Sequence, residues 1–104
     1  MILNGKEVKI DKLFEPIIKI LNDKGYITLF CCSGHVINKS IRHSYIMFHP
    51  EVDLPNYPSN YYYNHSNVID RNFNRVNYDD IINNAIEVLK WAENLPVNPI
   101  KIGD

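Results

Sequence analysis

The sequence predicts an α+β fold in which a small, mostly antiparallel sheet carries two packed helices. Two segments, 12–24 and 79–94, repeat apolar residues at the spacing of a helix that is buried along one side. Between them, the apolar runs 26–32, 45–49 and 68–76 are bounded by turn-forming residues, as strands are. The chain has 104 residues without a repeat or linker, and we expect residues 1–104 to form a single domain.

Composition indicates a globular protein, since 45% of the residues are hydrophobic and 22% are charged. The formal net charge of -1 does not support a generally basic nucleic-acid surface, although it leaves room for a local cationic patch. We expect no membrane association, because the apolar runs are too short to span a bilayer. Cys31 and Cys32 are adjacent and poorly placed for a mutual disulfide, so we expect reduced thiols and a cytoplasmic protein.

The N-terminal part predicts either a short hairpin or a turn followed by one strand, and then a helix. Asn4-Gly5 is a tight-turn dipeptide between two short apolar stretches. Asp11 can cap the helix 12–24, and Gly25 can end it in the left-handed conformation. The buried stripe of this helix is expected to contain Leu13, Phe14, Ile17, Ile18 and Leu21.

The segment 26–32 is predicted to be the central strand. Its residues are apolar on both faces, which is typical of an interior strand that is covered on both sides. Ser33-Gly34 ends this strand, and Pro50 stops the next one, 45–49. We expect these two strands to be antiparallel neighbours.

The C-terminal half predicts a long loop, a third strand and a closing helix. The loop 51–67 contains several prolines and tyrosines, and a loop of this length in a small domain is often functional or mobile. Asn77 is expected to cap the helix 79–94. The tail 97–104 is expected to pair as an edge strand or to stay loose. The helix's inner stripe is expected to contain Ile82, Ala85, Ile86, Leu89 and Ala92, with Trp91 beside it.

A polar corner follows the predicted central strand and suggests an anion or nucleotide pocket. Consecutive backbone N–H groups in such a turn can bind phosphate, nearby Arg and His can supply positive charge, and tyrosines can stack on a base. A plain turn that needs a glycine is the structural alternative. The predicted ligand-binding residues are Cys32, Ser33, Gly34, His35, Arg42, Arg71, Arg75 and Tyr62.

Two further chemistries are compatible with the same corner. Cys32 and His35 have the spacing of half a zinc site, which His43, His49 and His65 could complete, but the sequence shows no second tight pair. A Cys beside a His can also be activated as a nucleophile. The sequence does not single out an orienting acid. It assigns no metal ligand, no catalytic residue and no cofactor.

Two resemblances involve this corner. The helix ending at Gly25-Tyr26, the motif Cys32-Ser33-Gly34-His35, the strand 45–48 and the closing segment 91–96 resemble small uncharacterised phage and prophage proteins. That resemblance brings no function with it. Separately, Tyr26-Ile27-Thr28 followed by Cys32-Ser33-Gly34 resembles the strand and loop of the wybutosine tRNA methyltransferase family, whose members use S-adenosylmethionine.

The methyltransferase family's loop is Ser-Cys-Ser-Gly-Arg. Cys31 stands in place of its first Ser, and His35 in place of its Arg. This resemblance implies that Cys32, Ser33 and Gly34 shape a loop that faces a ligand.

Three functional hypotheses follow. The first is a phage-type protein that binds a small anionic or nucleotide-like ligand at residues 32–35. The second is a protein–protein inhibitor or adaptor, such as an anti-defence protein, that uses the aromatic loop 57–63 to contact a protein partner. The third is an enzyme, either a thiol catalyst or a relative of the methyltransferases.

Overall fold

The computed structural model describes residues 2–3, 6–7, 11–34, 43–64, 67–73 and 77–99. Two helices and a four-stranded antiparallel sheet confirm the predicted α+β fold class. The elements are β1 (Ile2–Leu3), β2 (Lys6–Glu7), α1 (Glu15–Asp23), β3 (Thr28–Cys32), β4 (His43–Phe48), β5 (Tyr62–Asn64), β6 (Val68–Asn72) and α2 (Tyr78–Asn94).

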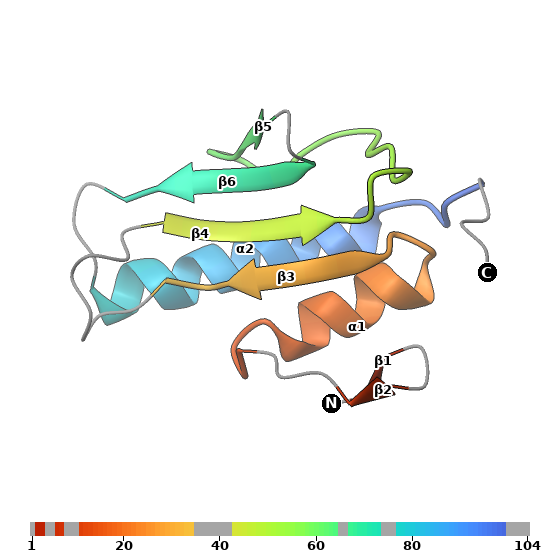
Figure 1. The fold of residues 1–104 in the computed structure, drawn as a ribbon. Helices are drawn as coiled ribbons and strands as arrows, with labels where there is room; N and C mark the ends of the chain where they lie inside the picture. The colour runs from red at the N-terminus through yellow and green to blue at the C-terminus, as the bar shows by residue number, and fades with distance from the viewer. Residues whose placement is uncertain are drawn as a thin grey trace.

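The larger sheet has the strand order β3-β4-β6-β5, and each pair of neighbours is antiparallel. The predicted pairing of the first two long strands is therefore confirmed. β1 and β2 form a separate antiparallel hairpin, as the Asn4-Gly5 dipeptide predicts. Both helices lie on one face of the four-stranded sheet, and Figure 1 views the sheet from the opposite side. The hydrophobic core lies between the sheet and the helices.

α1 forms where the first apolar stripe predicts a helix, although it is shorter than expected. Residues 12–14 form a turn, and Asp11 accepts a hydrogen bond from the Leu13 backbone in that turn instead of capping the helix itself. Gly25 follows the helix with a φ of 91°, as predicted. Leu13 is 37% exposed, whereas the rest of the predicted stripe is buried: Phe14, Ile17, Ile18 and Leu21.

The prediction that 26–32 is an interior strand is wrong, because β3 lies at an edge of the sheet. The register shifts between Thr28 and Phe30, which is the signature of a β-bulge. The shift leaves Leu29 41% and Phe30 65% exposed, although they are neighbours in the strand. The helices cover one face of β3 only, so its second apolar face is a surface.

The predicted inner stripe of α2 is confirmed at Ala85, Leu89 and Ala92, but not at its two isoleucines. Ile82 and Ile86 are 47% and 46% exposed, and the helix buries Ile81 in their place. Asn77 caps α2 as predicted, since its Oδ1 accepts a hydrogen bond of 2.9 Å from the Asp80 backbone. The residues buried on α2 are Ile81, Asn84, Ala85, Val88 and Ala92.

The segment after β4 is more ordered than the predicted loop. It contains β5, a strand that the sequence analysis missed because prolines and asparagines surround it. Val52, Pro58 and Tyr61 are buried, so this segment packs against the domain. Tyr61 is consequently unavailable to a partner, whereas Tyr57, Tyr62 and Tyr63 are exposed.

Lys24 ties the carboxyl ends of the two helices together. Its Nζ donates to the backbone oxygens of Ala92, Glu93 and Leu95 at 2.9, 2.7 and 2.6 Å. α2 has no basic residue in its last turn, so Lys24 supplies the positive charge that a helix carboxyl end favours. Beyond α2, residues 97–99 form no strand, and the rest of the predicted tail lies outside the described residues.

Candidate functional site: the outer sheet face

The sheet face opposite the helices carries a row of side chains that crosses all four strands. Cys32, Tyr45 and Asp70 are successive register partners, and Tyr62 pairs with Asp70 from the other side. Paired residues of antiparallel strands point to the same face of a sheet. Ser44, which alternates with this row in β4, is fully buried on the helix side.

The neighbouring rows add apolar and polar groups to this surface. Phe30 pairs with Met47, which pairs with Val68, on one side of the row; His43 pairs with Asn72 on the other. We call the whole surface the outer face. Its members are Phe30, Cys32, His43, Tyr45, Met47, Tyr62, Val68, Asp70 and Asn72.

Aromatic rings dominate the exposed part of the outer face. Phe30 is 65% and Tyr62 47% exposed. The rings of His43 and Tyr45 are stacked, with centroids 5.2 Å apart. Burial raises the pKa of Tyr45, and the nearby thiols and Asp70 raise it further, so its hydroxyl stays protonated at neutral pH. Such a surface can stack on a planar ring.

Asp70 contacts two polar side chains of the outer face, and a third is bonded to one of these. Its Oδ1 lies 3.0 Å from His43 Nδ1, and its Oδ2 accepts a hydrogen bond of 3.4 Å from the Tyr62 hydroxyl. Asn72 donates to that hydroxyl at 3.2 Å. The Asp70 side chain is only 14% exposed, whereas His43 is 40% exposed. Asp70 therefore holds His43 in place and leaves the imidazole accessible.

Ser33 in the predicted corner already has an anionic partner within the chain. Asp11 Oδ2 accepts hydrogen bonds from the Ser33 hydroxyl at 2.5 Å and from the Ser33 backbone at 3.4 Å. Ser33 is also buried, with 3% exposure. The Asp11 carboxylate therefore occupies the Ser33 donors that were expected to bind phosphate. The sequence alone does not indicate this contact.

Gly34 is buried against the start of α2. Its φ is 95°, a conformation that favours glycine. A Cβ at this position would lie 3.5 Å from the Phe73 ring and 3.6 Å from Ile81. Gly34 therefore lies in a turn that favours glycine and packs against Phe73 and Ile81. This agrees with the alternative of a plain turn.

The thiols are poorly suited to nucleophilic chemistry. Burial raises the pKa of Cys31 to about 11, with a further contribution from the charge of Asp11. Burial is also the main reason why the pKa of Cys32 is raised, and Cys32 is 8% exposed. Because the thiolate is the reactive form, both cysteines are expected to be unreactive near neutral pH.

We therefore expect slow modification of the native protein by a thiol-specific disulfide reagent. At about pH 8, a thiol with a pKa near 11 has roughly two orders of magnitude less thiolate than an ordinary cysteine. The rate can be followed by absorbance, with the urea-unfolded protein as the reference for full reactivity. The single variants Cys31→Ser and Cys32→Ser separate the two sites. A native Cys32 that reacts as fast as the unfolded chain would contradict this expectation.

Arg71 lies on the helix side of β6 and not on the outer face. Its Nη1 donates to Asn84 Oδ1 at 3.1 Å and lies 3.7 Å from Glu87 Oε2. Its guanidinium carbon is 5.0 Å from the centre of the Phe73 ring, which in turn borders Gly34. Arg71 therefore contacts Phe73, which borders Gly34, but its guanidinium is bound by side chains of α2.

Among the predicted ligand residues that the structure describes, Cys32 and Tyr62 alone lie on the outer face, at opposite ends of one row. Ser33, Gly34 and Arg71 are placed elsewhere, as described above. His35, Arg42 and Arg75, and the candidate zinc ligand His65, lie outside the described residues.

His43 and Asp70 were not recognised as a pair. Period two places residues 43, 45 and 47 on one face of their strand, but the sequence does not show that Asp70 lies beside them.

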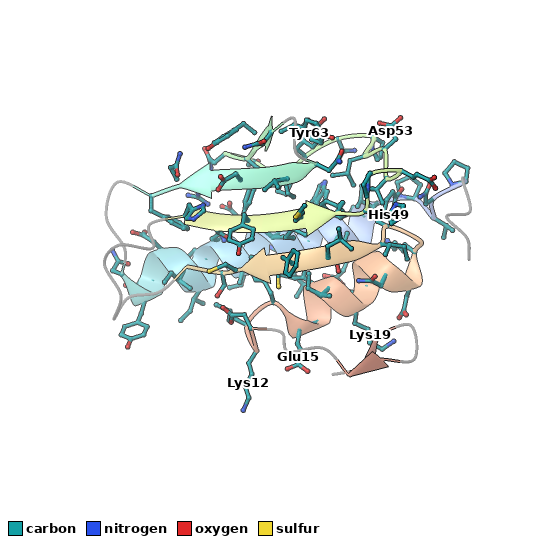
Figure 2. The ribbon with its side chains drawn as sticks, viewed as in Figure 1. Lys12, Glu15, Lys19, His49, Asp53 and Tyr63 are labelled. Carbon is teal, nitrogen blue, oxygen red and sulfur yellow. The ribbon has the colours of Figure 1, made fainter. Side chains whose placement is uncertain are left out.

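The described residues gather no metal site, since they contain no group of three or more His, Cys, Asp or Glu that could hold an ion. His43 is the first residue of β4, and His49 follows its last residue. Figure 2 shows His49 at the end of β4 away from the corner. His49 Nδ1 instead accepts a hydrogen bond from the Glu51 backbone.

Comparison with known proteins assigns no family. No helix among the described residues is long and apolar enough to cross a membrane. No protein-family model matches the chain, and no curated protein or solved structure is significantly similar to it. The resemblances to phage proteins and to the wybutosine methyltransferases therefore stay predictions.

Proposed function

We propose that this chain is a cytoplasmic protein that binds a small nucleotide-like ligand, and that the ligand's base stacks on the outer face. The observation that carries the proposal is the set of aromatic rings on a sheet face that neither helix covers: Phe30, His43, Tyr45 and Tyr62. Base–aromatic stacking tolerates any base, because every base presents a π-face.

The size of the outer face supports a small ligand. Four strands with five paired residues in the longest ladder give a surface of about 14 Å by about 17 Å. This is a flat footprint of about 240 Å². One or two bases fit this area.

The sequence contains basic side chains that can neutralise the charge of a phosphate. The described part of the outer face contains no Lys or Arg. The segments 35–42 and 74–76 hold Lys39, Arg42 and Arg75 and no acidic residue. In the sequence, the first segment directly precedes His43 and the second directly follows Phe73. The proposal assigns the ligand's anionic part to Arg42, Arg75 and His35.

We expect Tyr45→Leu to weaken nucleotide binding by about fivefold or more, since stacking on one base contributes about 1–3 kcal/mol. Isothermal titration with a panel of mononucleotides measures the change. Tyr78→Leu is the matched control, because Tyr78 is 64% exposed on α2. Equal affinity in the two variants, or no heat with any nucleotide, would contradict the proposal.

One observation favours a second candidate, a protein contact beside β5. The rings of Tyr57 and Tyr63 are stacked at 5.6 Å, and both side chains are 43% exposed. Tyr63 lies at the β5 edge of the sheet (Figure 2). Tyr is favoured at protein interfaces. The titration separates the two candidates, because this tyrosine pair is not part of the outer face.

A further inference from the structure

The imidazole of His43 is held in a defined protonation pattern. Its Nδ1 lies 3.0 Å from Asp70 Oδ1, and a carboxylate can only accept a hydrogen bond. Nδ1 therefore carries the hydrogen, and in the neutral ring Nε2 carries the lone pair. Nε2 is the atom of this ring that can take a proton from a ligand.

The orientation of the ring is fixed from two sides. Tyr45 stacks against His43, and Asp70 is itself held by the Tyr62 hydroxyl, which also accepts from Asn72. His43 is 40% exposed and Asp70 14% exposed. An accessible imidazole that a shielded carboxylate positions is the arrangement of a general base.

We propose that His43 is a general base and that the outer face cleaves a short single-stranded RNA at the 2′-hydroxyl of a bound ribonucleotide. This inference rests on the proposed function, because the aromatic rings hold the base next to His43. Asp70 is a positioning residue that acts through His43.

The choice of reaction follows from what the outer face offers. Cys32 is buried, burial raises the pKa of Tyr45, and the Tyr62 hydroxyl is hydrogen-bonded to Asp70 and Asn72. The described outer face therefore supplies a base but no activated nucleophile of its own. Transesterification of RNA needs none, because the substrate's own 2′-oxygen attacks the adjacent phosphorus.

The reaction is one transesterification step. His43 Nε2 takes the proton of the 2′-hydroxyl while the 2′-oxygen forms a bond to phosphorus. The bond between phosphorus and the 5′-oxygen of the next nucleotide breaks, and that oxygen takes a proton from water. The products are a 2′,3′-cyclic phosphate and a 5′-hydroxyl end.

The test uses a short, fluorescently labelled single-stranded RNA of mixed sequence and the same sequence with every 2′-hydroxyl methylated. Fluorescence anisotropy with the methylated strand measures binding alone. Gel electrophoresis and mass spectrometry of the unmodified strand measure cleavage and identify the product ends. A chelator is present so that contaminating metal nucleases do not contribute.

We expect His43→Ala and His43→Gln to lower the cleavage rate by about a hundredfold or more and to keep binding of the methylated strand. Added imidazole is expected to restore part of the activity of His43→Ala. The matched control is His49→Ala, which removes the same side chain at the far end of β4 and is expected to cleave normally.

The outcomes separate the two proposals. Binding of the methylated strand without cleavage of RNA overturns the general-base inference and leaves the proposed function standing. Cleavage that persists in both His43 variants, or products with a 5′-phosphate, also overturns it. Failure to bind either strand, together with no cleavage, overturns the general-base inference, and the mononucleotide titration then decides the proposed function.

A separate variant, Asp70→Asn, tests the positioning role of Asp70. Asp70→Asn is expected to lower cleavage by about tenfold or more with little change in binding. Nitrogen NMR of the His43 ring is expected to show hydrogen shifting from Nδ1 to Nε2 in this variant. An unchanged ring spectrum with unchanged cleavage removes the positioning role.

Discussion

Replacing Asn84 with Ala is expected to lower the free energy of unfolding by about 3–4 kcal/mol, a large share of the roughly 5–15 kcal/mol that stabilises a typical domain. Asn84 lies in α2 with 1% exposure. Its Oδ1 accepts from the Tyr61 hydroxyl at 3.0 Å and from Arg71 at 3.1 Å, and its Nδ2 donates to the Ser44 hydroxyl at 3.2 Å.

The physical reason is the loss of two buried hydrogen bonds, to Tyr61 and Ser44, and of one partly buried bond to Arg71. The hydroxyls of Tyr61 and Ser44 lie 2.7 Å apart and keep each other as partners, but each loses its bond to the amide. A hydrogen bond to a charged group such as Arg71 contributes about 1.5–3 kcal/mol, and the cavity left by the amide adds to the cost.

Urea denaturation followed by circular dichroism measures the change. The control is Asn83→Ala, because Asn83 is the exposed neighbour on the same helix and the substitution is identical. An Asn83→Ala variant within about 0.5 kcal/mol of the wild type would be normal for a surface position. Equal stability of the two variants would show that the Asn84 network does not stabilise the fold.

Replacing Ile81 with Ala is expected to cost about 2–4 kcal/mol and to lower Tm by about 10 °C or more. Ile81 is 7% exposed, and its side chain borders Gly34. Ile82→Ala, one residue further along α2, is expected to change the free energy of unfolding by less than about 0.5 kcal/mol, since Ile82 is 47% exposed.

This pair of variants tests the rotation of α2 directly. Calorimetric melting of both proteins, at the same concentration and pH, gives the comparison. If Ile82→Ala were the more damaging change, the helix would present the stripe that hydrophobic periodicity predicts, and the contacts described for Asn84 could not form.

The rotation of α2 shows where sequence reasoning reached its limit. Ile81 and Ile82 are identical in hydrophobicity, so apolar periodicity alone cannot choose between them. Asn84 decides the rotation, because it is a polar residue that the core satisfies with three side chains from other elements. Those partners become neighbours only in the folded chain, and the sequence gives no direct sign of them.

Local signals were more informative than long-range ones. The helices, the hairpin at Asn4-Gly5, the cap at Asn77 and the stop at Gly25 all follow from residues close in sequence, and the structure confirms them. The place of β3 in the sheet depends on which strands pair beyond its immediate neighbour. Apolar residues on both faces do not reveal that order.

The candidate site shows the same division. The corner after β3 was located from sequence, but its donors proved to be occupied by Asp11, which lies 22 residues earlier in the chain. The pair of His43 and Asp70 is 27 residues apart and forms only through the pairing of β4 with β6. Residue types alone could not bring either pair together.

The bulge in β3 bears on how copies of this protein behave at high concentration. An edge strand with Leu29 and Phe30 exposed would be a template for aggregation if it were flat, because its free N–H and C=O groups could pair with another chain. The register shift between Thr28 and Phe30 interrupts that pattern. At the opposite edge, β5 is only three residues long. Within the described sheet, both edges therefore discourage the strand-to-strand growth that leads to fibres, while the aromatic outer face stays open.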